Sequence, residues 1–148
     1  MKKSKGGRKK PPQAPTPKSI KPGFNLNKSP FRWSFEKCFW KHKGWQKLNV
    51  QVFTERIISK LQNFETMTWQ EVFETSGGKS EGHGNNNHFI DATQLPKDER
   101  TVFVKHNFAE DYEEKIFSLR LGGKERLIGV VDMGVFKILW FDADHEFF

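Results

Sequence analysis

The chain has 148 residues, a net charge of +7 and a single cysteine, Cys38. This length fits one domain with one core, and a lone cysteine excludes an internal disulfide framework and fits a reducing cytosol. Because no apolar stretch approaches the roughly 20 residues that cross a bilayer, and the first 30 residues contain no apolar signal segment, we expect a cytoplasmic protein that does not enter a membrane.

The positive charge is concentrated in residues 1–30, which contain nine basic residues and no acidic residue. Removing these nine from the 25 basic residues of the chain leaves 16 against 18 acidic ones, so residues 31–148 are nearly neutral. The first 30 residues are rich in Pro, Gly and Lys, which predicts a disordered, partly polyproline-like arm. Such an arm either binds phosphate backbones without reading sequence or only keeps the protein in solution. The arm residues expected to contact nucleic acid are Lys2, Lys3, Lys5, Arg8, Lys9 and Lys10.

The folded domain is expected to begin at Phe31, where the composition becomes rich in aromatic and aliphatic residues. Phe31, Trp33 and Phe35 alternate with polar residues, as they do in a strand that is buried on one face. Residues 31–40 are therefore the first predicted strand.

Two helices are predicted after this strand. Asn49 is a suitable N-cap, and apolar residues at helical spacing predict a helix over residues 50–64. Thr68 and Glu71 form a T-x-x-E capping box, which predicts the start of a second, short helix. The Ser-Gly-Gly sequence at residues 76–78 is expected to end it.

The middle of the chain has weaker patterns. Residues 77–88 hold four glycines and three consecutive asparagines, which predicts a mobile loop. The sequence HFIDATQL that follows is typical of an extended segment. Pro96 with Asp98 and Glu99 predicts a further helix over about residues 96–106.

The last third contains three β-rich runs, EKIFSLRL, ERLIGVV and VFKILWF, separated by two glycine-containing turns. They predict a three-stranded antiparallel meander. An N-terminal strand, two or three helices and then this meander make an α+β domain over residues 31–148, with the helices packed on one face of the sheet.

This order of elements, with the sequence SLRLGGKERLIGVV and a last strand that leads into a histidine, resembles the RelE/ParE superfamily of small bacterial toxins. Members of that superfamily are mostly ribosome-dependent mRNA endonucleases or gyrase inhibitors, and a partner antitoxin neutralises them. The resemblance implies a toxin of a toxin-antitoxin pair, with an antitoxin protein and RNA or the ribosome as partners. It also implies site residues. Arg120 and Arg126 match arginines on the second and third strands, and His145 matches a histidine or tyrosine near the end of the last strand.

These three residue types suit RNA cleavage by the 2′-hydroxyl of the RNA itself. That reaction needs a base for the hydroxyl proton, a cation for the charge that develops at phosphorus, and an acid for the leaving 5′-oxygen. His145 can act as acid or base, and Arg120 and Arg126 can bind phosphate oxygens in two-point fashion. We expect neither a cofactor nor a metal ion in this mechanism.

The relative position of the two arginines depends on the turn between them. A two-residue loop at Gly122-Gly123 places Arg120 opposite Glu125, which would make an ordinary exposed ion pair. A three-residue loop places Arg120 opposite Arg126 instead. The sequence leaves both registers open.

The acidic side chains around His145 have two interpretations. Asp142, Asp144 and Glu146 would repel RNA at a polar strand end, or they would help His145 to act as an acid. The same residues with His83 and His88 are a rival metal site. The H-x4-H spacing is not that of a helical zinc pair, so no metal site is expected.

Most aromatic residues lie at strand or helix spacing and are expected in the core. Trp40 and Trp45, in the lysine-rich sequence WKHKGWQK, are the candidates for stacking on nucleic-acid bases or for a partner groove. His42 and His106 adjoin lysines and are interpreted as surface residues. The alternative to a nuclease is a noncatalytic module of the same fold that binds nucleic acid or protein.

Overall fold

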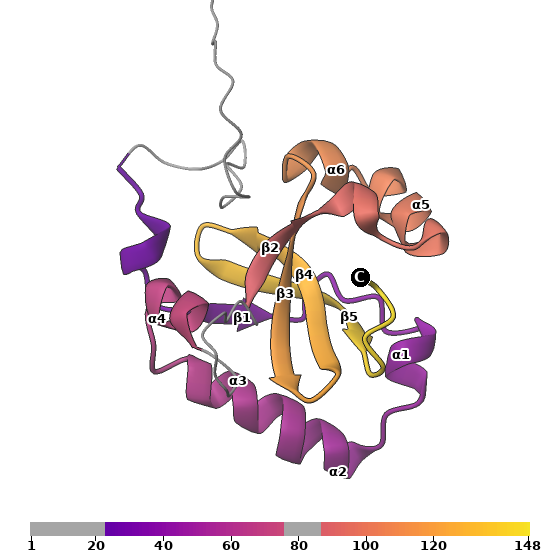
Figure 1. The fold of residues 1–148 in the computed structure, drawn as a ribbon, viewed down its shortest axis with the longest axis horizontal. Helices are drawn as coiled ribbons and strands as arrows, with labels where there is room; N and C mark the ends of the chain where they lie inside the picture. The colour runs from indigo at the N-terminus through magenta and orange to yellow at the C-terminus, as the bar shows by residue number, and fades with distance from the viewer. Residues whose placement is uncertain (1–22, 76–86) are drawn as a thin grey trace, which may run out of the picture.

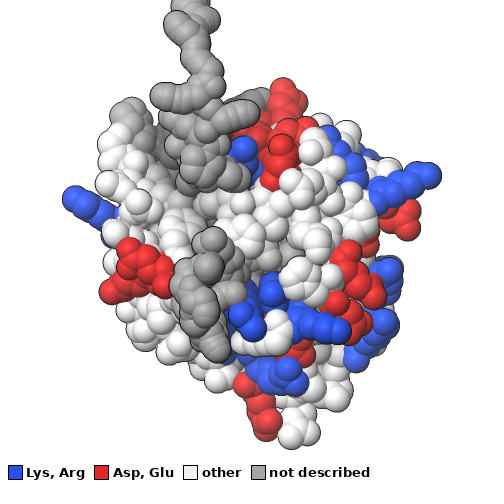
Figure 2. Space-filling model, in the orientation of Figure 1, with Lys and Arg blue, Asp and Glu red and all other residues white. Residues whose placement is uncertain are grey.

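The computed structural model of the chain describes residues 23–75 and 87–148. The fold is α+β, with a five-stranded mixed sheet in the order β1-β5-β4-β3-β2 and helices around it (Figure 1). Basic and acidic side chains are interspersed on the face shown in Figure 2. No helix within the described ranges is long and apolar enough to cross a membrane. The predicted arm residues Lys2, Lys3, Lys5, Arg8, Lys9 and Lys10 lie outside these ranges.

The predicted C-terminal meander is confirmed, because the last three strands pair antiparallel in sequence order. The edge strand β2 adds antiparallel to β3, and the edge strand β1 adds parallel to β5. β1 is much shorter than the predicted strand over residues 31–40, since the chain turns away after Ser34. The strands are β1 (Arg32–Ser34), β2 (His88–Asp91), β3 (Lys115–Gly122), β4 (Glu125–Asp132) and β5 (Val135–Asp142).

The predicted helix starts are also found. The Asn49 side chain accepts a hydrogen bond from the Val52 amide, and Thr68 and Glu71 make both bonds of the capping box. The helix over residues 50–64 is continuous but contains a π-helical segment. The helical elements are η1 (Leu26–Lys28), α1 (Lys43–Gln46), α2 (Val50–Val52), η2 (Phe53–Ile58), α3 (Ser59–Phe64), α4 (Trp69–Glu74), η3 (Ala92–Gln94), α5 (Lys97–Lys105) and α6 (Phe108–Asp111).

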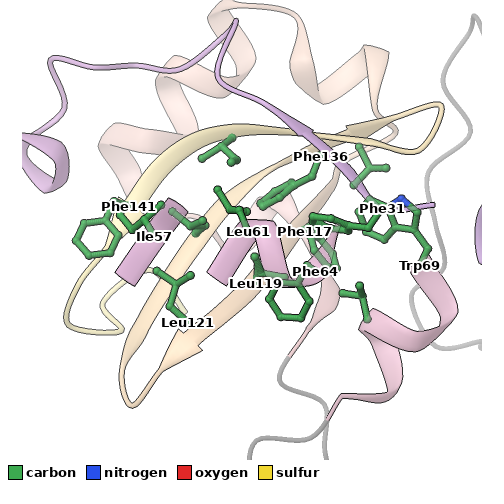
Figure 3. Packing of buried hydrophobic residues seen from close by; sticks show 14 of the residues in the cluster. Phe31, Ile57, Leu61, Phe64, Trp69, Phe117, Leu119, Leu121, Phe136 and Phe141 are labelled. Atoms are coloured by element: carbon green, nitrogen blue, oxygen red, sulfur yellow. The ribbon is translucent and has the colours of Figure 1, made fainter. Parts of the chain in front are cut away.

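Helices cover both faces of the sheet, which differs from the one-sided layer predicted. On one face, residues of α3 and α4 pack with Phe117 and Leu119 of β3 (Figure 3). On the other face, α5 and α6 pack with Ile116 of β3 and with Ile128 and Val130 of β4. The central strands are apolar at consecutive positions, so each strand has an apolar residue for both faces.

The folded part begins earlier than the predicted boundary at Phe31. The Trp69 amide donates to the Ser29 carbonyl, and Pro30 forms a bridge with Thr68. Leu26 packs against the larger of the two cores. Residues 24–30 therefore belong to the domain, because they complete the surface around α4.

A β-bulge interrupts the pairing of β4 with β5. Ile128 lies opposite Trp140, but the next residue, Gly129, lies opposite Ile138, so Leu139 is an extra residue in β5. A Cβ atom on Gly129 would lie 2.1 Å from the Lys137 carbonyl oxygen. Only glycine leaves room for the backbones to approach this closely.

The bulge makes the Leu139 carbonyl available to the segment before α1. It accepts hydrogen bonds from the Phe39 amide at 3.1 Å and from the indole N–H of Trp45 at 3.1 Å. The Cys38 thiol lies 3.6 Å from the same oxygen, and burial raises the pKa of that thiol to about 12. One carbonyl therefore holds residues 38–45 against the sheet.

Gly129→Ala is expected to lower the free energy of unfolding by about 3 kcal/mol, because the new methyl group would force the two strands apart. Gly122→Ala is the matched control, since a Cβ at Gly122 meets no atom within 4 Å. Urea denaturation of both variants measures the difference. Equal stability of the two variants would contradict this account of the bulge.

Candidate functional site

One row of side chains crosses three strands near the turn between β3 and β4. Arg120 lies directly opposite Arg126, and Arg126 lies opposite Asp142 of β5. Directly opposed residues of neighbouring strands project to the same face of a sheet. The structure thus has the register that pairs the two arginines. It arises because the pairing shifts between Arg120 and Gly122, which makes Leu121 an extra residue.

A cavity of about 190 Å³ opens on this face of the sheet. Its lining includes His88, Ser118, Arg126, Asp142, His145 and Phe148. The cavity therefore brings together two predicted site residues, Arg126 and His145, while Arg120 lies beside it opposite Arg126. His88, which the sequence connected only with a metal alternative, joins them. The sequence pattern from which its position could have been predicted is the alternation in HFID, which places His88 and Ile90 on one face of a strand.

Arg126 is held by its own hairpin. Its guanidinium donates to the Gly123 carbonyl at 2.8 Å and to the Glu125 carbonyl at 3.1 Å. Burial and the neighbouring charge of Arg120 lower the pKa of Arg126, while Asp142 acts in the opposite direction. An anion bound here would relieve the repulsion between the two guanidinium groups.

Asp142 organises the turn that carries His145. It is 5% exposed, and its two carboxylate oxygens accept hydrogen bonds from the amides of Glu146 and Phe147, each at 2.9 Å. Asp144 and Glu146 are exposed. Asp142 is therefore the acidic residue near His145 whose carboxylate binds backbone amides of the turn. In Figure 1 this turn follows the end of β5, close to the marked C-terminus.

The His145 ring has a defined tautomer. Its Nδ1 lies 3.1 Å from the Phe148 backbone oxygen, which can only accept a hydrogen bond, so Nδ1 carries the proton. In the neutral ring the lone pair is then on Nε2. His145 is exposed and adopts a left-handed backbone conformation with φ 59°. An exposed imidazole with a lone pair on Nε2 can take a proton from a substrate.

The two tryptophans named by the sequence differ in exposure. Trp40 is 46% exposed. Trp45 is 5% exposed, stacks on Phe141 and donates to Leu139, so it is a core residue and cannot stack on a base. The lysines near Trp45 in sequence are themselves exposed. Their presence does not indicate that the indole of Trp45 is exposed.

The prediction that His42 is a surface residue is wrong. Its Nε2 lies 2.6 Å from a Glu99 carboxylate oxygen, and both side chains are largely buried. The Gly44 amide donates to Nδ1 at 3.0 Å, so Nδ1 has no proton and Nε2–H donates to Glu99. His42 thus connects the start of α1 to α5. His106 is exposed as predicted.

Metal ligands do not gather in the described residues. No group of three or more His, Cys, Asp or Glu side chains within residues 23–75 and 87–148 is arranged to hold a metal ion. His83, one half of the H-x4-H pattern, lies outside these ranges.

The comparisons with known proteins give no family. A scan against protein-family models, a search of curated proteins and a search of solved structures each found no match to this chain. The resemblance to RelE/ParE toxins therefore stays a prediction. It rests on the order of the strands and on Arg120, Arg126 and His145.

Asp142→Asn is expected to loosen the turn that carries His145, because an amide side chain offers only one acceptor to two backbone N–H groups. The free energy of unfolding should fall by about 2 kcal/mol, and hydrogen exchange at the amides of Glu146 and Phe147 should become faster. Asp144→Asn is the matched control, because Asp144 is exposed. Unchanged protection of both amides would show that Asp142 does not hold the turn.

Proposed function

We propose that the chain is the toxin of a toxin-antitoxin pair and cuts mRNA at the ribosome without a metal ion. The observation that supports this proposal is that His88, Arg126 and His145 line one cavity. It combines two groups that can transfer protons with one fixed cation, which are the requirements for cleaving RNA through its own 2′-hydroxyl.

The strand order supports a division of roles between the two histidines. β3 and β4 separate β2, which begins at His88, from β5, which leads into His145, and Arg126 lies on β4. In-line displacement at phosphorus places the attacking and leaving oxygens on opposite sides of the phosphorus atom. The proposal therefore assigns the proton of the attacking oxygen to one histidine and the proton for the leaving oxygen to the other, with Arg126 as the cation.

The proposed reaction has one chemical step. Nε2 of His145 takes the proton of the 2′-hydroxyl, and the 2′-oxygen attacks phosphorus. Arg126, with Arg120 beside it, stabilises the charge on the nonbridging oxygens. The bond from phosphorus to the 5′-oxygen breaks, and His88 gives a proton to that oxygen. The products are a 2′,3′-cyclic phosphate and a free 5′-hydroxyl.

The basic residues of the arm support an attachment to ribosomal RNA. Eight positive charges with no negative charge among residues 1–23 would bind phosphates by releasing counterions, independently of sequence. The folded part is nearly neutral, so the arm would supply most of the long-range attraction. The proposed antitoxin would cover the cavity and stop substrate from entering.

A noncatalytic binding module remains the second candidate. The observation in its favour is the near-neutral charge of residues 31–148, because a surface of mixed charge suits a protein partner better than a nucleic acid. Such a module would not depend on the histidines of the cavity.

Cleavage of mRNA in a translating extract should slow by about a hundredfold or more in His145→Ala and in His88→Ala. Arg126→Ala should slow it to a similar extent, because it removes the charge that stabilises the phosphorane-like transition state. The products should carry 2′,3′-cyclic phosphates, and mRNA with a 2′-O-methyl group at the cleavage site should stay intact there. Gel analysis of end-labelled RNA measures all of these outcomes.

His106→Ala and Arg32→Ala are the matched controls, because both side chains are exposed and neither lines the cavity. Both variants should keep wild-type cleavage and should arrest growth on expression in a bacterial host as the wild type does. Growth arrest that persists in His145→Ala and Arg126→Ala would exclude the nuclease and favour the noncatalytic module.

A further inference from the structure

Trp40 lies on a base of other aromatic rings, outside the cavity described above. Its ring centroid is 5.1 Å from that of Phe35, 5.0 Å from that of Trp45 and 6.3 Å from that of Phe53. Even so, the side chain is 46% exposed. One side of the indole therefore packs on the domain while the rest of it contacts solvent.

This indole is held in place before any ligand binds. The Gln46 side chain donates to the Trp40 carbonyl at 2.9 Å, and Trp45 beneath it is bonded to Leu139. A Cβ on Gly44 would lie 2.0 Å from the Phe141 carbonyl oxygen, so α1 lies directly on β5. A ring with few remaining degrees of freedom loses little entropy when a ligand stacks on it.

The sequence segment that contains Trp40 is positively charged, between Glu36 and Glu55. Residues 37–54 contain four lysines and no acidic residue, although the domain as a whole is nearly neutral. All four lysines are exposed, and none forms an ion pair with a carboxylate in the part of the chain that the structure describes. The four are Lys37, Lys41, Lys43 and Lys47.

We propose that Trp40 and these four lysines form a binding site for single-stranded RNA, the Trp40 platform. One base stacks on the exposed part of the indole, and the ammonium groups contact the flanking phosphates. Stacking on an aromatic side chain tolerates any base, because every base has a π-face. The platform therefore holds substrate without selecting its sequence.

The position of the platform relates it to the cavity. α1 begins three residues after Trp40 and lies against Phe141, and the next residue of β5 is Asp142, which lines the cavity. As a subsite for the RNA that the nuclease cuts, the platform rests on the proposed function. Binding of RNA to it can nevertheless be measured without cleavage.

The test is binding of the full chain to a short, fluorescein-labelled 2′-O-methyl oligouridine, followed by fluorescence anisotropy. Trp40→Ala should weaken binding about tenfold, and Trp40→Phe should keep most of the affinity because a ring remains. Lys41→Ala with Lys43→Ala should weaken binding and reduce its salt dependence. Val104→Ala is the control, because Val104 is 47% exposed on α5 and has no role in the platform.

Tryptophan fluorescence gives a second readout, with unlabelled oligonucleotide. Trp45, Trp69 and Trp140 are each 5% exposed or less and Trp33 is partly buried, so quenching by a stacked base should come mainly from Trp40. It should disappear in Trp40→Ala. Wild-type affinity and undiminished quenching in that variant would overturn the platform, as would binding of an acidic peptide in place of RNA.

The cleavage and binding assays together distinguish a failure of the Trp40 platform from a failure of the nuclease proposal. If the wild type cuts no RNA but Trp40→Ala weakens binding, the platform stands and the nuclease fails. If RNA is cut and Trp40→Ala binds as tightly as the wild type, the nuclease stands and the platform fails.

Discussion

The extra residue in β5 is the constraint on which the site depends. Before the bulge, Ile138 faces the core under α3 and α4, and simple alternation would place residues 140 and 142 on that same side. The bulge at Leu139 reverses the alternation, so Trp140 and Asp142 face the side of α5. Asp142 thereby meets Arg126, and the chain that follows carries His145 to the cavity.

The same bulge organises the opposite edge of the site. The Leu139 carbonyl, which the bulge removes from the strand pairing, accepts hydrogen bonds from the Phe39 amide and the Trp45 indole. These bonds fix the segment that contains Trp40. Cavity and platform are thus two results of one irregularity, which the absence of a side chain at Gly129 permits. Sheet irregularities beside functional sites commonly re-aim side chains in this manner.

Local patterns predicted the local structure well. The capping box at Thr68, the helix after Pro96 and the three-stranded meander each depend on residues close in sequence. The parallel pairing of β1 and the cover on both faces depend on contacts between distant segments. Arg126 and His145 were predicted from their chemistry and from a resemblance. The register of Arg120 and Arg126 stayed open because Leu121 is accommodated as an extra residue. His42 was misread because its partner, Glu99, is 57 residues away.

The backbone of His145 limits which sequences could serve this site. A left-handed φ is unfavourable for residues with a Cβ, least so for Asn, Asp and His, and most for β-branched residues. The hydrogen bonds from the Glu146 and Phe147 amides to the Asp142 carboxylate help to offset that strain. Divergent homologues that keep the turn should therefore avoid Val and Ile at this position, and those that keep the proposed chemistry should keep His. Homologues that keep both Asp142 and a suitable residue at position 145 could therefore be recognised in an alignment even where the rest of the sequence has changed.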